Sequence, residues 1–256
     1  GRVMAEAVAS LREYPKESFF GLGPDSRRED LTRFALRTPE VAGRAGVRVL
    51  PAVLAGGGIG VLSPRTNEGT TDFVRSSGFV EVDYRQPLNA RRGGWYRLDV
   101  SQFSDRAGGT WSFRRTDLDL RQYFGFLADR RVIALRGYVS SSDASEGSLG
   151  VPFYLMPTLG GNDTLRGFRN YRFRGPHAML LQAEYRWELW SGLDAALFYD
   201  AGKVEMQRSD LNFKRLEDDY GFGFRFNTAN GVIMRVDAAF GSRDGKHLHI
   251  VFGGVF

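Results

Sequence analysis

The sequence predicts an all-β protein, a transmembrane antiparallel up-and-down β-barrel, and three observations support this fold class. Apolar and polar side chains alternate with a period of two through most of the 256 residues, as in strands that have two different faces. Aromatic residues make up 13% of the chain and glycines number 32, which is typical of a barrel with aromatic girdles. Arginines and carboxylates share the polar faces, which favours a lumen lined by paired charges.

The alternation predicts twelve strands, and the clearest is LLQAEYRWELW at residues 180–190. Strands of about 10 residues, at about 3.3 Å per residue and a tilt of about 40–45°, span an apolar band of about 25 Å. Tight turns are expected at Ser191-Gly192, Asn230-Gly231 and Asp244-Gly245. The predicted strands are residues 2–12, 31–49, 53–62, 77–86, 95–105, 111–124, 131–142, 178–190, 193–203, 217–227, 231–241 and 246–256. The tryptophans are expected at the membrane interfaces, at Trp95, Trp111, Trp187 and Trp190.

Composition excludes several classes of protein and site. No run of about 18 apolar residues exists, so a helical membrane protein is excluded. The 35 basic and 30 acidic residues are interleaved, so no nucleic-acid partner is expected. The chain has no cysteine and therefore no disulfide or thiolate chemistry. Paired acids such as Asp117 and Asp119 lie beside arginines, so no metal site and no cofactor are expected.

The sequence does not predict an enzyme. A lipid hydrolase would need a serine next to a histidine base, and the chain has only His177, His247 and His249 and no GxSxG motif. His247 and His249 alternate with apolar residues near the C-terminus, so they are expected to line the lumen.

Residues 143–177 form the longest predicted loop and contain the segment LGGNDTLRGFRNYRF. A phosphate-binding loop is a poor interpretation because no helix signature and no P-loop lysine follow the glycines. A nucleic-acid patch would require an open basic groove, whereas acidic residues such as Glu184 are near in sequence. The remaining interpretation is an extracellular loop folded into the lumen, where Gly167 allows close backbone approach and an arginine anchors the loop.

The loop sequence Leu165-Arg166-Gly167-Phe168 resembles a motif on the sixth extracellular loop of the bacterial surface-antigen superfamily. That superfamily includes the central barrel of the outer-membrane β-barrel assembly machine, its translocation-and-assembly relatives and the two-partner secretion transporters. A second signature of that superfamily is similar to the strand motif Phe198, Asp200 and Gly202.

The resemblance implies that Arg166 pairs with Asp200 in the lumen and that Glu184 is a second acidic partner. The C-terminal strand HLHIVFGGVF, with Phe252 and Phe256, is similar to the signal by which outer-membrane proteins are recognised and inserted.

The resemblance also implies a place in the bacterial outer membrane and a role in protein insertion, assembly or translocation. Expected partners are outer-membrane lipid and lipopolysaccharide, with client proteins or periplasmic factors. Residues 1–256 are expected to form a single barrel domain without a periplasmic transport-associated domain. Since family barrels commonly have sixteen strands, we expect either further strands before Gly1 or a reduced barrel. Alternatives are a passive pore, a reduced structural barrel, and the membrane anchor of a longer polypeptide that carries a periplasmic domain.

Overall fold

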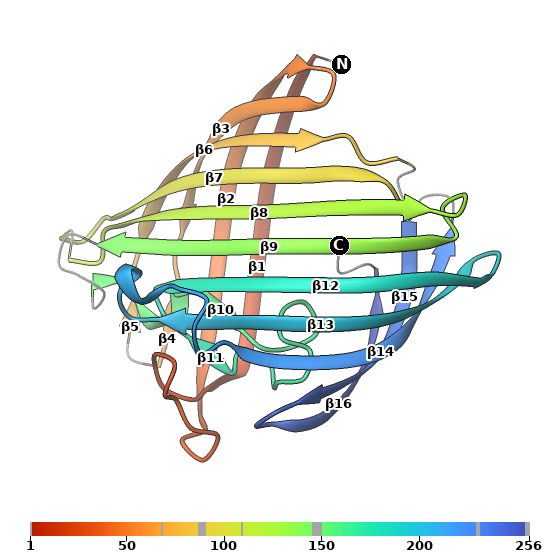
Figure 1. Ribbon diagram of the computed structural model, residues 1–256. Coiled ribbons are helices and arrows are strands. Elements are labelled where there is room, and N and C mark those ends of the chain that lie inside the picture. Colours follow the sequence, from red (N-terminus) through yellow and green to blue (C-terminus); the bar gives the residue numbers. More distant parts are fainter. Residues whose placement is uncertain are drawn as a thin grey trace.

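The computed structural model describes residues 2–67, 69–86, 91–108, 110–144, 150–228 and 231–253, and most of them lie in one antiparallel sheet (Figure 1). In the described residues this sheet has 14 strands, of which β4 and β5 have two residues each, so twelve strands are long. The long strands are β1 (Val3–Phe19), β2 (Thr32–Leu50), β3 (Val53–Leu62), β6 (Phe73–Asp83), β7 (Gly93–Asp105), β8 (Phe113–Phe126), β9 (Arg131–Ala144), β12 (His177–Trp190), β13 (Leu193–Glu205), β14 (Glu217–Thr228), β15 (Gly231–Gly241) and β16 (Gly245–Phe252). Each pairs with its neighbours in chain order, which confirms the all-β, up-and-down architecture.

The connections contain only short elements. β4 (Arg65–Thr66) and β5 (Gly69–Thr70) form a small hairpin, and β10 (Thr158–Leu159) pairs with β11 (Phe173–Arg174) as a separate sheet. Two 3-10 turns, η2 (Phe153–Leu155) and η3 (Arg208–Asp210), complete the described elements. Within the described ranges, no helix has the length and apolar character needed to cross a bilayer.

The long strands match the predicted ones, with small differences at their ends. The largest difference is in β1, which continues to Phe19 where a loop was predicted from residue 13. The β1–β2 register shifts between Tyr14 and Glu17, so a bulge contains Pro15. A bulge leaves a residue outside the ladder, and proline has no N–H to donate, so the strand passes this point and continues.

The two faces of the wall have the expected chemistry. On β12 and β13 the inward residues Glu184 and Asp200 are 1% and 0% exposed, whereas Leu197 on the outer face is 51% exposed. One tryptophan departs from the expectation of interface anchors. Trp95 shares the inner face with Arg97, and the guanidinium of Arg121 lies 4.6 Å above its ring. A cation–π contact with a lumen arginine therefore holds this indole inside.

Glycines bend the wall where β2, β3 and β6 meet. Gly46 on β2 lies opposite Gly56 on β3. A Cβ atom at Gly56 would lie 2.1 Å from the carbonyl oxygen of Ala45, so only glycine allows the strands to come this close. Beyond this point β1 and β2 run across the direction of β7, β8 and β9 (Figure 1).

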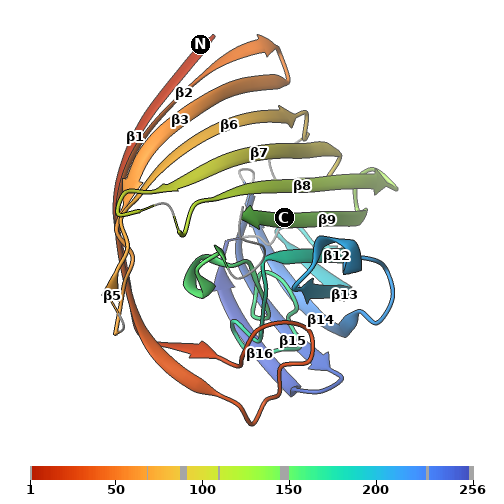
Figure 2. The same cartoon turned by 90° about the vertical axis from the view of Figure 1, so that its left-hand side faces the viewer.

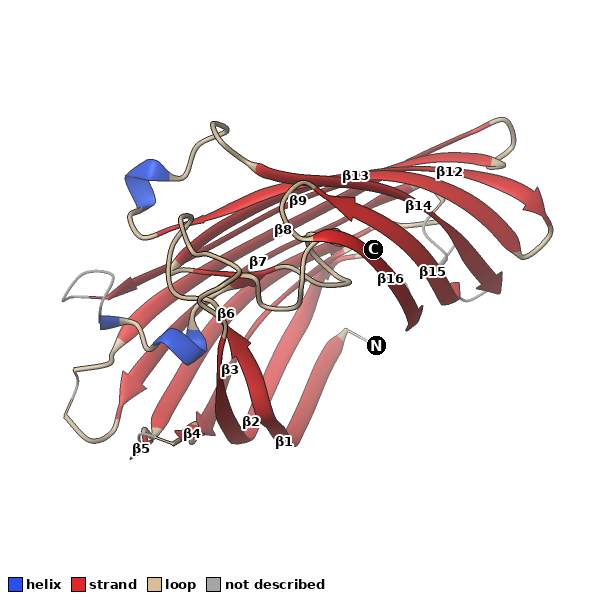
Figure 3. Cartoon of the chain, turned by 90° about the horizontal axis from the view of Figure 1, so that it is seen from below, coloured by secondary structure: helices blue, strands red, loops and turns tan. Residues whose placement is uncertain are grey.

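The wall is curled but has two free edges. β1 pairs with β2 and β16 pairs with β15, and no ladder joins β1 to β16 among the described strands. Figure 2 shows the two edges apart, and Figure 3 shows them from below. The sheet thus forms a barrel wall without the closing ladder that a complete cylinder requires.

The segment between β9 and β12 folds into the concave side of this wall (Figure 2). We call residues 150–176 the lid, the strand ends on its side the loop end, and the opposite strand ends the turn end. Lid residues Leu165 and Phe168 are buried against Leu180 and Val204 of the wall. A second apolar cluster joins lid residues Val151 and Met156 to β3, β6, β7 and β8. The lid therefore forms much of the core at the loop end.

Candidate functional site

Arg166 of the lid is completely buried and forms ion pairs with three strands of the wall, the longest of them to Asp237 Oδ2 on β15 at 3.8 Å. Its Nε and Nη2 donate to Asp200 Oδ2 and Oδ1, both at 2.7 Å, and its Nη1 donates to Glu184 Oε2 at 2.9 Å. The guanidinium carbon lies 3.5 Å from the centre of the Phe198 ring. Burial opposes the charge of Arg166, but Asp200 and Glu184 outweigh burial and raise its pKa. The lid thus carries a permanent cation held in a fixed geometry.

The two closest acidic partners of Arg166 have different surroundings. Glu184 also accepts from Arg186 and from Arg225, each at 2.6 Å. Asp200 has one further side-chain donor, Gln182 Nε2 at 3.1 Å. Glu184 therefore shares its charge among several arginines, whereas Asp200 depends on Arg166.

The network continues along the inner face of β14 and β15. Asp237 accepts from Arg225 Nη1 at 2.5 Å and from Arg235 Nη1 at 2.8 Å. Arg235 also donates to the lid, to Asn162 O at 2.7 Å and to Asp163 Oδ1 at 2.8 Å. The tip of the lid is therefore bound to β15 as well as to β12 and β13.

Close backbone packing adds a second kind of contact. A Cβ atom at Gly167 would lie 2.5 Å from both Asp219 Cβ and the backbone nitrogen of Gly241, so the lid touches β14 and β15 directly. The Nε2 atom of His249 on β16 is 2.7 Å from the carbonyl oxygen of Arg166. The last strand is thereby linked to the same lid residue that binds Asp200.

The second half of the lid binds the segment between β1 and β2. Arg172 donates to Ser26 Oγ and Ser26 O, both at 2.9 Å, and its Nε lies 3.3 Å from Asp244 Oδ1 between β15 and β16. Arg174 donates to Glu17 Oε1 at 2.5 Å. The lid therefore connects the first and last hairpins at the loop end, although β1 and β16 do not pair.

An aromatic contact lies beside these ion pairs. Tyr171 packs edge-on against Tyr14, with ring centroids 6.3 Å apart. Burial, together with Tyr14 and Glu17, raises the pKa of Tyr171 to about 12. The phenol consequently remains neutral at physiological pH.

The other residues singled out from the sequence lie as follows. Leu165 and Phe168 are in the lid core, and Gly202 faces inward on β13, where a Cβ atom would lie 2.7 Å from Met179 O. Phe252 ends β16 and is 83% exposed, whereas Phe256 lies outside the described residues. Their role as an insertion signal stays a prediction.

Sequence reasoning missed several members of the site. Arg225, Arg235 and Asp237 lie on alternating strands but belong to no motif that connects them with Arg166. Asp163 lies in the predicted loop but outside the motif of residues 165–168. Their common signal is that strand alternation places Arg225, Arg235 and Asp237 on the lumen side.

A serine and a histidine do meet elsewhere on the wall. Ser141 Oγ lies 2.8 Å from His177 Nδ1, and both residues are 4% exposed. In the described contacts Asp143 accepts from Ser141 Oγ at 3.3 Å and does not orient the imidazole. A base that activates a serine requires a group that orients its ring and a substrate that reaches the hydroxyl, so this pair fits a structural hydrogen bond.

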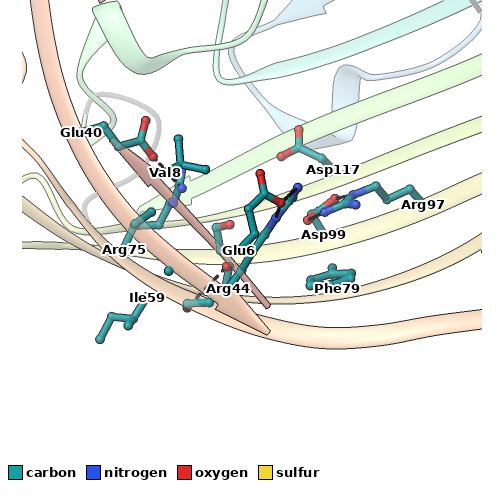
Figure 4. A pocket seen from close by; sticks show the side chains of 15 residues that line it. Glu6, Val8, Glu40, Arg44, Ile59, Arg75, Phe79, Arg97, Asp99 and Asp117 are labelled. Carbon is teal, nitrogen blue, oxygen red and sulfur yellow. Dashed lines mark hydrogen bonds and ion pairs between the residues drawn. The ribbon is translucent and has the colours of Figure 1, made fainter. Parts of the chain in front are cut away.

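The inner face of the first half of the wall surrounds a polar cavity of about 380 Å³ (Figure 4). Arg44 pairs with Glu6 there, and Arg97 donates to Asp99 at 2.6 Å. Arg75 forms an ion pair with Glu40 at 2.7 Å. Opposite charges thus line the lumen where the lid does not fill it.

The comparisons with known proteins fit this architecture. The Omp85 superfamily domain matches residues 62–254, which include the lid motif, the Asp200 strand and all later strands. The chain belongs to the Omp85 superfamily. This membership confirms the resemblance of the chain to the bacterial surface-antigen superfamily.

Two solved Omp85-like structures are similar in fold. BamA from Haemophilus ducreyi lacking POTRA domains 1-3 superposes with a TM-score of 0.70 at 12% identity, over 98% of this chain and 62% of that chain. CdiB from Escherichia coli superposes with a TM-score of 0.65 at 13% identity, over 98% of this chain and 50% of that chain. The chain therefore spans less than two thirds of either structure. No curated protein has significant sequence similarity to it.

Proposed function

We propose that the chain forms a single outer-membrane barrel domain, residues 1–256, that inserts, assembles or translocates polypeptides. In this proposal Arg166 clamps the lid to Asp200 and Glu184, and the protein is not an enzyme. The observation that carries the proposal is the buried Arg166 contact inside an Omp85 wall. The fold similarity to BamA and CdiB supports it.

Folding of a client tests the proposal. The purified protein is reconstituted in liposomes, and a small urea-unfolded outer-membrane barrel is added. The folded fraction is followed by heat-modifiable gel mobility. We expect folding several-fold faster than in empty liposomes and slower with Arg166→Met. Arg130→Met, at an exposed arginine of the turn end, serves as the matched control. No acceleration by the unmodified protein would refute an insertion role.

A passive pore is the second candidate, and the polar cavity beside Arg44 and Arg97 favours it. Paired charges around a water-filled passage are typical of pores. Single-channel recording separates the two functions, because a large steady conductance without any effect on client folding indicates a pore.

A further inference from the structure

Two arginines face each other on the outer side of the wall with few partners among the residues that the structure describes. Arg37 on β2 and Arg65 on β4 are directly opposite in the strand register. They lie on the outer face, because Leu36 and Thr38, on either side of Arg37, are buried and point inward. Directly opposite side chains have Cβ atoms about 4.5–5.5 Å apart, where like charges destabilise a sheet. This site therefore favours an anion.

The described residues supply little negative charge there. Arg37 approaches Glu13 at 3.9 Å, with 54% and 60% of the two side chains exposed. Arg65 is exposed, and its side chain has no ion pair or hydrogen bond to any residue that the structure describes. An exposed pair at this distance is weak, so the described residues leave the second arginine uncompensated.

The position of the arginines relative to the apolar surface indicates what kind of anion fits. The outer row of β2 is apolar or glycine from Pro39 to Val49, which is ten residue steps, or about 33 Å along the strand at about 3.3 Å each. At a tilt of about 40–45° this row covers about 23–25 Å along the membrane normal, close to the apolar band of about 25 Å in outer-membrane barrels. From Val41 towards the loop end, the next outward residue is Pro39, and the one after it is Arg37.

The neighbouring strands reach the same boundary. Leu11 on β1 and Val61 on β3 are 52% and 45% exposed on the outer face, level with the end of the apolar row. Further along β2 towards the loop end, Arg33 is exposed on the outer side and pairs in register with Ser18. Three arginines thus stand directly above a continuous apolar surface. A ligand that covers both must carry an anionic head and an apolar body.

We propose that Arg33, Arg37 and Arg65 bind the phosphate of a membrane lipid in the leaflet around the loop end. Guanidinium groups bind phosphate oxygens in bidentate pairs, and a shared phosphate removes the repulsion between Arg37 and Arg65. The acyl chains of the lipid lie on Leu11 and the apolar row of β2. The inference rests on the outer-membrane location in the proposed function, which makes this lipid the phosphorylated lipid A of lipopolysaccharide.

Lipid binding by the purified full chain tests the inference. Native mass spectrometry from detergent micelles, with titrated lipid A, gives the apparent affinity. The site variant is Arg37→Gln/Arg65→Gln, and Arg65→Gln alone is the mild variant, because this side chain has no described partner whose loss could impair folding. Arg130→Gln is the matched control, since it removes an exposed arginine at the turn end. Dephosphorylated lipid A and inorganic phosphate are the ligand controls.

We expect a loss of affinity of at least tenfold in the double variant, a smaller loss in Arg65→Gln and none in Arg130→Gln. Dephosphorylated lipid A should bind the unmodified protein as weakly as lipid A binds the double variant. Unchanged binding in the double variant, or an equal loss in Arg130→Gln, would overturn the inference. Displacement of the lipid by millimolar inorganic phosphate would also overturn it, because the site would then bind a free anion. Client folding in liposomes free of lipid A reports on the proposed function separately.

Discussion

The unequal surroundings of Asp200 and Glu184 lead to a prediction about the clamp. In Arg166→Met, Asp200 loses its bidentate side-chain partner and keeps the hydrogen bonds from Gln182 Nε2, at 3.1 Å, and from the backbone N–H of residue 166, at 3.4 Å. Glu184 keeps Arg186 and Arg225, each at 2.6 Å. Both carboxylates are buried, and a buried charge that loses its partner costs about 3–5 kcal/mol. We therefore expect the free energy of unfolding to fall by about 3–5 kcal/mol, almost entirely through Asp200.

A second substitution that removes the unpaired carboxylate tests whether Asp200, and not Glu184, accounts for the loss of stability. In Arg166→Met/Asp200→Asn no unpaired carboxylate remains at residue 200, so we expect recovery of more than half of the loss. In Arg166→Met/Glu184→Gln, by contrast, Arg186 and Arg225 lose their shared carboxylate, so stability should fall further. Urea unfolding in micelles, followed by tryptophan fluorescence and gel mobility, measures all variants. The reasoning is refuted if Glu184→Gln rescues Arg166→Met as well as Asp200→Asn does.

Two further predictions concern how the lid is seated. Gly167→Ala places a Cβ atom 2.5 Å from the backbone nitrogen of Gly241, so the lid must shift at a cost of about 1–3 kcal/mol, and limited proteolysis should cut it faster. Gly108→Ala, where a Cβ atom meets nothing within 4 Å, should behave as the parent protein does. Arg235→Gln removes the charged donor to Asp163, so hydrogen exchange at residues 160–165 should accelerate while Arg166 stays protected; equal acceleration at both places would contradict separate anchoring.

Much of the wall could be predicted from the sequence because one physical rule covers it. A strand with lipid on one side and charge on the other must alternate, so the pattern on residues 180–190 gives both the strand and its inner face. The bulge at Pro15 could not be predicted in the same way. Alternation breaks there just as it does at the start of a loop, and only the pairing with β2 shows that the strand continues.

The contacts of the lid could be predicted only in part. The Arg166 and Asp200 positions came from a motif, which names residues but not their surroundings. Which arginines share Glu184 depends on the register of β12 to β15, and the sequence pattern assigns residues to a face without aligning neighbouring strands. The contact between Gly167 and Gly241 could not be predicted either, because a glycine has no side chain that would indicate which backbone it packs against.

Several ion pairs on the inner face of the wall do not involve Arg166. Arg225, Arg235 and Asp237 pair with one another and with Glu184 whether or not Arg166 is present, so these charges keep partners when Arg166 is removed. Among the contacts of Arg166, loss of the Asp200 pair is therefore the most costly, because the other carboxylates stay compensated.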